Sequence, residues 1–161
     1  MKKYVFLLLA PFMLAAGLPS AEAALADSGL TLSCASCVLM EKETGAFLLE
    51  ENSHEKLEPA SVTKIMTLLL VMEAVDSGQL SLEDLVTVSA YAAGMGGSQV
   101  YLKEGEQMPV SEMIKCVTVV SGNDCAVALA EHLAGSEGAF VTRMNQRAQE
   151  LGMADTTFLN C

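Results

Sequence analysis

Residues 61–77 constrain the fold most, because they form a long run that is apolar on nearly every side when drawn as a helix. Gly78 follows directly, where a glycine commonly ends a helix. The sequence therefore predicts a central, buried helix. A membrane span is excluded, because Lys64 and Glu73 bracket fewer than ten uncharged residues and a span needs about 20. The apolar positions of the run are Ile65, Met66, Leu68, Leu69, Val71, Met72 and Val75.

Two short extended stretches precede this helix. Residues 34–40 and 46–50 are separated by a polar segment that ends in Gly45. A glycine at this point suits a turn with positive φ, so the pattern predicts a β-hairpin. Residues 51–59 are polar and end in proline, which indicates a loop that leads into the helix.

Three more helices are expected after the central one. The first starts at residue 110, runs to about residue 120 and is interrupted by the Ser-Gly-Asn triplet at residues 121–123. The second covers residues 126–134. The third is capped by Ser136 and closed by Gly152. The triplet is therefore expected in a turn between two helices.

The stretch between the central helix and residue 110 carries weaker signals. Residues 81–84 (Ser-Leu-Glu-Asp) resemble a helix start, residues 86–88 a short extended segment, and residues 94–98 a glycine-rich loop. Together with the hairpin and the helices, these signals predict an α+β fold.

Length and charge exclude some functions. At 161 residues, 52% of them hydrophobic, the chain is long enough for one domain with a substantial core. The net charge of −11 leaves no basic field for a phosphate backbone, so no nucleic-acid partner is expected.

The first residues have the features of an export signal. Lys2 and Lys3 precede an apolar stretch over residues 4–14, and residues 21–23 (Ala-Glu-Ala) form a small-residue cleavage site. The apolar stretch is shorter than the roughly 20 residues of a spanning helix. We therefore expect a signal peptide over residues 1–26 and the folded domain over residues 27–161.

The cysteines suggest no complete disulfide framework, because the chain holds five of them. Cys34 and Cys37 are expected on a strand, where three residues span about 10 Å, beyond the roughly 7 Å limit for a disulfide. Cys116 and Cys125 are interpreted as small buried hydrophobic residues. No cysteine or histidine spacing supplies a zinc site, so neither a metal nor a cofactor is expected.

Ser61 and Lys64 form a Ser-x-x-Lys motif at the start of the central helix. This spacing places hydroxyl and amine one turn apart on one face, where the amine can accept the hydroxyl proton. Lysine is a base only when neutral, and apolar surroundings lower its pKa. The alternative is that Ser61 only caps the helix and Lys64 is a solvated residue.

Ser121 and Asn123 strengthen the catalytic interpretation. A second hydroxyl can relay a proton to a leaving amine, and an amide can hold a substrate carbonyl. On its own the triplet would indicate a plain turn, since glycine and asparagine tolerate unusual φ values. The two clusters together predict a serine acyl-transfer site.

With both clusters in place, the chain resembles the serine D-alanyl-D-alanine carboxypeptidases of the peptidase S11 family, also called low-molecular-mass penicillin-binding proteins. The resemblance covers essentially all of residues 27–161. It is carried by residues 44–45, 58–67, 121–124, 128–132, 144–145, 151–153 and 157–160.

The resemblance implies a role for each residue of the two motifs. Ser61 would attack the penultimate carbonyl of a peptidoglycan stem peptide ending in D-Ala-D-Ala, and Lys64 would be its base. Ser121 would relay a proton to the departing D-alanine, and Asn123 would bind the peptide backbone. β-Lactams would acylate Ser61, and the protein would act at the extracytoplasmic face of the membrane or in the cell wall.

The resemblance also implies a β-lactamase/transpeptidase-like fold, here as the N-terminal hairpin of its sheet and its helical subdomain. The Lys-Thr-Gly motif of the family does not occur in residues 1–161. Residues 27–161 are therefore expected to be a partial peptidase domain, an N-terminal fragment that is truncated before the C-terminal strands and inactive when expressed alone. The resemblance further implies that a C-terminal segment absent from residues 1–161 can provide membrane association.

Two alternatives remain open. A class A β-lactamase also combines Ser-x-x-Lys with a Ser-x-Asn triplet, but its Glu-x-x-Leu-Asn pattern supplies a glutamate that activates water. The corresponding stretch here, residues 156–160, has Thr156 in place of that glutamate. The second alternative is a non-catalytic domain that binds the cell wall or acts in morphogenesis.

Overall fold

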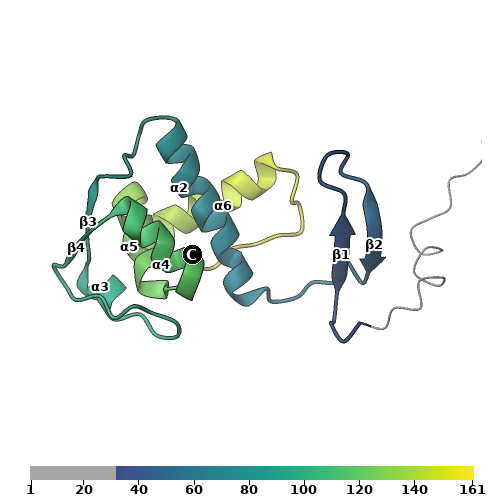
Figure 1. The fold of residues 1–161 in the computed structure, drawn as a ribbon, viewed down its shortest axis with the longest axis horizontal. Coiled ribbons are helices and arrows are strands. Elements are labelled where there is room, and N and C mark those ends of the chain that lie inside the picture. Colours follow the sequence, from purple (N-terminus) through teal and green to yellow (C-terminus); the bar gives the residue numbers. More distant parts are fainter. Residues whose placement is uncertain (1–31) are drawn as a thin grey trace, which may run out of the picture. The chain divides into compact units, whose positions relative to one another are not determined.

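The computed structural model describes residues 32–161, so the expected signal peptide lies outside the described residues. The chain divides into two compact units, of which the first ends at Lys56 and the second covers Leu57–Cys161. The elements form an α+β arrangement, as expected, with the strands and helices labelled in Figure 1.

The described part of the first unit is a β-hairpin. Strand β1 (Cys37–Met40) pairs antiparallel with β2 (Phe47–Glu51), and Leu39 lies opposite Leu49. The turn between them places Gly45 at φ +70°, a region that glycine adopts without steric cost. The predicted hairpin is confirmed, including the reason for its glycine.

The start of the first strand was predicted wrongly. Residues 34 and 35 form a bend, and β1 begins only at Cys37. The side-chain amide of Asn52 donates to the Ala35 carbonyl at 3.1 Å, which holds the bend against the end of β2. Cys34 therefore lies outside the strand on which it was expected, and both Cys34 and Cys37 are free cysteines.

The central helix of the second unit starts later than predicted and is buried on one face only. A 3₁₀ turn, η1 (Ala60–Thr63), precedes α2 (Lys64–Asp76). Ile65 is 68% exposed and Met72 is 39% exposed, so the expectation of burial on all sides is wrong. Helices α5 (Asn123–Ala134) and α6 (Glu137–Glu150) pack against α2, and the side chains of Ile65 and Met72 stay exposed. The buried residues of α2 are Lys64, Met66, Thr67, Val71 and Ala74.

The predicted helix start at residues 81–84 is also wrong, because these residues form a turn. The Asp84 carboxylate accepts a hydrogen bond from the Ser81 N–H at 2.8 Å, and the Asp84 carbonyl accepts one from the Val110 N–H at 2.9 Å. Serine and aspartate cap helices and close turns through the same hydrogen bonds, so the sequence signal did not distinguish the two.

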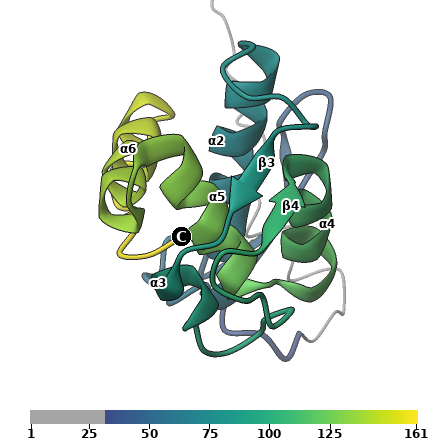
Figure 2. The same ribbon diagram turned by 90° about the vertical axis from the view of Figure 1, so that its left-hand side faces the viewer.

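A short ribbon follows this turn. Strand β3 (Leu85–Thr87) pairs antiparallel with β4 (Gln107–Pro109), and the single-turn helix α3 (Ala90–Ala93), which was not predicted, lies between them in the chain. Figure 2 shows the two strands side by side, with β3 against helix α5.

Three helices complete the unit, as predicted. They are α4 (Val110–Val120), α5 (Asn123–Ala134) and α6 (Glu137–Glu150). Ser136 caps α6 by accepting a hydrogen bond from the Ala139 N–H, as its sequence position indicated. Helix α5 begins three residues earlier than predicted and carries an unbroken buried run over residues 124–130, so it is the centre of the core.

Within residues 32–161, none of the helices is long and apolar enough to cross a membrane.

Candidate active site

Ser61 lies on the 3₁₀ turn η1 rather than at the cap of an α-helix. The residue before it, Ala60, has φ +48°, a conformation that costs a non-glycine residue about 1–2 kcal/mol. The Lys64 N–H donates to the Ser61 carbonyl, so one turn of backbone fixes both residues of the motif. The Ser61 residue is exposed, and its hydroxyl accepts a hydrogen bond from the Ser121 side chain.

Lys64 is buried, with only 8% of its surface exposed, at the first position of α2. Burial lowers its pKa below the ordinary value, and the nearby Cys161 thiol opposes this in part. Its Nζ donates to Asn123 Oδ1 at 2.6 Å. The lysine is thus held in place by a neutral acceptor, and its surroundings favour the uncharged amine.

Ser121 lies at the C-terminal end of α4 and contacts Ser61. It ends α4 in the left-handed conformation, with φ 59° and ψ 38°, and its Oγ donates to Ser61 Oγ at 2.8 Å. The Gly122 N–H that follows bonds back to the Cys116 carbonyl at 3.3 Å. This sharp end of the helix brings two hydroxyls sixty residues apart in the chain into contact.

Asn123 is the first residue of α5 and is held by three hydrogen bonds. Its Oδ1 accepts from Lys64, its Nδ2 donates to the Gly96 carbonyl at 2.7 Å, and its backbone N–H donates to the Ser98 carbonyl at 2.7 Å. The structure therefore brings all four predicted residues together: Ser61, Lys64, Ser121 and Asn123.

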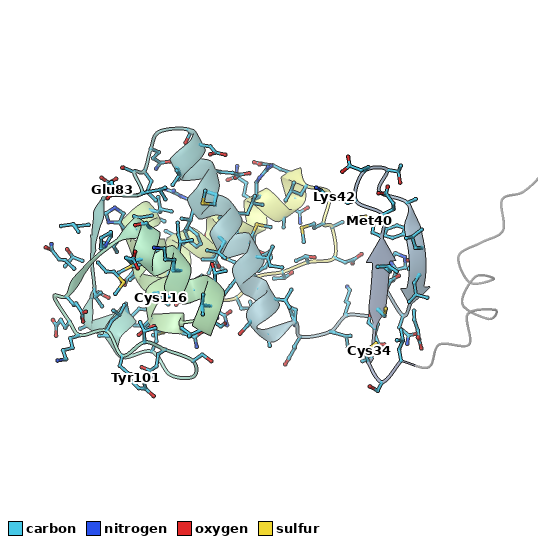
Figure 3. All side chains as sticks on the ribbon, viewed as in Figure 1. Cys34, Met40, Lys42, Glu83, Tyr101 and Cys116 are labelled. Atoms are coloured by element: carbon cyan, nitrogen blue, oxygen red, sulfur yellow. The ribbon has the colours of Figure 1, made fainter. Side chains whose placement is uncertain are left out.

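Asp124 was missed as a site residue, although it directly follows the triplet. It is completely buried, and its carboxylate accepts hydrogen bonds from the N–H groups of Val100 and Leu102, each at 3.1 Å to Oδ2. Tyr101 between them has φ +62° and is exposed at the surface (Figure 3). Asp124 thus fixes the loop whose carbonyls accept hydrogen bonds from Asn123. The sequence signal that could have indicated Asp124 was an acidic residue at the start of an apolar helix.

A sequence profile of the family described as D-alanyl-D-alanine carboxypeptidase matches residues 21–161. The chain belongs to this family. It is 48% identical to D-alanyl-D-alanine carboxypeptidase DacF of Bacillus subtilis over 163 aligned residues. That alignment covers 99% of this chain and 42% of DacF, so the chain spans less than half the length of this relative.

Solved structures of a D-alanyl-D-alanine carboxypeptidase and of a penicillin-binding protein have the same fold. The carboxypeptidase DacD of Francisella tularensis matches with a TM-score of 0.79 and 39% identity, over 81% of this chain and 32% of that one. Penicillin-binding protein D2 of Listeria monocytogenes, solved with ampicillin bound, matches with a TM-score of 0.72 and 30% identity, over 81% of this chain and 52% of that one. The predicted fold class is confirmed, and these relatives support the carboxypeptidase interpretation over the β-lactamase alternative.

Replacing Asp124 with alanine is expected to destabilise the folded unit by about 3 kcal/mol, because the backbone N–H groups of Val100 and Leu102 lose a charged acceptor. Urea denaturation of the full-length protein measures the change. The control is Asp76→Ala at the exposed end of α2, where the change is expected to be within about 0.5 kcal/mol. Equal urea-denaturation midpoints for the Asp124→Ala and Asp76→Ala variants would refute the stabilising role of Asp124.

Proposed function

We propose that the protein carrying this chain is a serine D-Ala-D-Ala carboxypeptidase that removes the terminal D-alanine from peptidoglycan stem peptides. The observation that carries the proposal is the pair of contacts that closes the site: Ser121 Oγ to Ser61 Oγ, and Lys64 Nζ to Asn123 Oδ1. These contacts join two hydroxyls, a buried amine and an amide, and they support the proposal because acyl transfer needs this set of groups.

In the proposed reaction, Ser61 Oγ attacks the penultimate carbonyl carbon while its proton passes to the neutral Lys64 amine. The oxyanion that forms is stabilised in part by the backbone N–H of Ser61. Ser121 then relays a proton to the departing nitrogen of D-alanine as the C–N bond breaks. Water attacks the ester on Ser61, releases the shortened peptide and returns the proton to the hydroxyl.

The lowered pKa of Lys64 supports its assignment as the base, because a lysine with the ordinary pKa is almost fully protonated at neutral pH. Asn123 stands beside this amine and is fixed through its own backbone and side chain. Its assigned role is to bind the substrate backbone.

The proposal includes the partners and the location. The substrates are stem peptides ending in D-Ala-D-Ala, and β-lactams would acylate the same serine. Residues 1–26 would direct export, after which the protein would act at the extracytoplasmic face of the membrane or in the cell wall.

The test uses the purified full-length protein and an N-acylated tripeptide ending in D-Ala-D-Ala. Release of free D-alanine is expected, together with slow turnover of penicillin, and the matched peptide ending in L-Ala-L-Ala should release nothing. Rapid penicillin turnover would indicate a β-lactamase instead. Absence of both release and acylation would indicate a non-catalytic domain.

Replacing Gly97 with alanine is expected to lower the rate of penicillin acylation by roughly 10- to 100-fold, because a small displacement of a positioned group is costly. A Cβ at Gly97 would lie 2.8 Å from Asn123 Nδ2, so the amide has to move. Fluorescent penicillin labelling over time measures the rate.

Gly105→Ala is the matched control for Gly97→Ala. Gly105 has φ +76° against +75° for Gly97, but a Cβ there meets no atom within 4 Å. Both substitutions carry the same backbone strain, and only the one at Gly97 pushes on Asn123. Equal rates for the two variants would show that this contact does not affect acylation.

A further inference from the structure

Helix α5 contains two acidic residues, Asp124 and Glu131, and the active site as described uses only the first of them. The two residues are seven positions apart, so they lie on the same face of the helix. Asp124 fixes the far end of the loop that holds Asn123, through Val100 and Leu102. Glu131 is half-buried two turns further along, and its role is open.

Glu131 holds the residue that caps helix α3. Its Oε2 accepts a hydrogen bond from Ser89 Oγ at 2.6 Å, and the same Ser89 oxygen accepts one from the Ala92 N–H at 2.9 Å. The direction of the hydroxyl proton is therefore set by Glu131, and a lone pair of the oxygen stays on the helix side. A helix of one turn is not stable by itself. The position of α3 thus depends on this cap and on its packing against α5, which Figure 2 also shows.

The other end of α3 leads directly to Asn123. The Ala92 carbonyl accepts a hydrogen bond from the Met95 N–H at 3.2 Å, and the carbonyl of the next residue, Gly96, accepts one from Asn123 Nδ2 at 2.7 Å. Hydrogen bonds therefore run from Glu131 through the cap and the turn of α3 to the amide of Asn123. The path starts and ends on α5.

The Gly96 carbonyl decides which end of the Asn123 amide faces the catalytic lysine. The terminal torsion of an asparagine has no sharp preference of its own, so its hydrogen bonds set the orientation. The NH₂ group is taken by Gly96, and the oxygen therefore points to Lys64 Nζ, at 2.6 Å. A displaced Gly96 carbonyl would release the amide from this orientation.

We propose that Glu131 is a positioning residue for Asn123. By fixing the cap of α3, it places the Gly96 carbonyl and so holds the amide in the orientation in which it binds the substrate backbone. The inference rests on the proposed function for its effect on acylation. For its effect on the loop, it rests on the hydrogen bonds alone.

A second carboxylate also contacts α3 and supplies a matched control. Tyr91 Oη donates to Glu137 Oε2 at 2.6 Å, the same distance as between Ser89 and Glu131. Tyr91 is 52% exposed, and the Tyr91 hydroxyl does not take part in the cap. Tyr91→Phe therefore removes a hydroxyl-to-carboxylate bond from the same helix while it leaves the path to Asn123 intact.

The first experiment measures acylation of the full-length protein by fluorescent penicillin over a range of concentrations. Glu131→Ala is expected to raise the half-saturating concentration roughly 10-fold and to keep the maximal rate within about threefold, because the role of Asn123 is to bind substrate. Ser89→Ala breaks the same link from the other side and should give the same shift. Glu131→Gln keeps an acceptor for Ser89 and, like Tyr91→Phe, should behave as the parent.

Three results would overturn the proposal. The first is parental acylation in the Glu131→Ala or the Ser89→Ala protein. The second is an equal loss in Tyr91→Phe, or a loss that Glu131→Gln does not restore, since either would indicate a general loosening of α3. The third is a lower maximal rate with an unchanged half-saturating concentration, which would exclude an effect through substrate binding.

The second experiment follows hydrogen exchange of backbone N–H groups and needs no activity. The reporters are the N–H of Met95, which bonds to Ala92, and that of Asn123, which bonds to Ser98. Both should exchange faster in Glu131→Ala than in Glu131→Gln, and equal exchange would overturn the proposal. Absence of labelling in the parent protein would instead refute the proposed function, while exchange would still decide whether Glu131 holds the loop.

Discussion

Replacing Ser61 with alanine is expected to lower D-alanine release by about 10³-fold or more, because removing the nucleophile of an acyl-transfer site leaves only the contribution of binding and oxyanion stabilisation. Ser61 is exposed and its hydroxyl is bonded to the Ser121 side chain rather than to the backbone of the helix, so folding should be unaffected and the melting temperature should stay close to that of the parent. The initial rate of release from the tripeptide ending in D-Ala-D-Ala measures the effect.

The control for Ser61→Ala is Ser77→Ala at the other end of α2. Ser77 is an exposed serine whose hydroxyl donates to the Ala74 carbonyl. Its replacement should leave the rate of release within about twofold of the parent, since it lies at the opposite end of the helix from the site. A folded Ser61→Ala protein with parental activity would exclude Ser61 as the nucleophile.

Replacing Lys64 with glutamine is expected to lower the rate of penicillin acylation by about 10²- to 10⁴-fold, the usual range for loss of a general base. Glutamine keeps a donor for Asn123 Oδ1 but accepts no proton at neutral pH. The rate of labelling with fluorescent penicillin measures the effect. Lys115→Gln on the exposed face of α4 is the control, because the Lys115 side chain is bonded to Glu112 on the same helix. The labelling rate of this variant should match that of the parent.

The pH dependence of acylation gives a second test of Lys64. The reactive form is the neutral amine, so the rate should increase with pH through the pKa of Lys64 and become constant above it. Because burial lowers this pKa, the rise in rate should occur at a lower pH than the ordinary titration of lysine. Lys64→Gln should lose this increase, and a parental pH profile in the variant would exclude Lys64 as the base.

Much of the fold could be predicted, because periodicity and end signals agreed in several elements. The α6 helix has an apolar face, a serine cap and a closing glycine, and the structure has each of these features. The hairpin turn likewise needed a positive φ at Gly45, where only glycine is unstrained. In such segments, local sequence and tertiary structure favour the same conformation.

The predictions of secondary structure and burial were wrong where contacts between distant parts of the chain determine the local structure. Residues 81–84 form a turn because the Asp84 carbonyl is bonded to Val110, a contact far away in the sequence. Apolar composition predicted that α2 is buried all round, but composition does not say which neighbours cover each face, and Ile65 is exposed. Exposure of this kind follows from packing, which the sequence pattern of one helix does not specify.

The chemical groups of the candidate site were predictable, but the framework that holds them was not. Ser61, Lys64, Ser121 and Asn123 belong to short motifs whose residue types and spacing have a chemical meaning, so the sequence alone indicates them. Asp124 acts through backbone N–H groups more than twenty residues away, and Gly97 through its close approach to Asn123. Contacts to backbone leave no motif in the sequence.

The most direct test of the central claim, that the two motifs form one serine acyl-transfer site, is the position of the covalent penicillin adduct. The full-length protein is labelled with penicillin and digested, and the modified peptide is sequenced by mass spectrometry. A single adduct on Ser61 is predicted, and it should form far more slowly in Lys64→Gln. An adduct on a different residue, or D-alanine release that persists while Ser61 is replaced, would contradict the account.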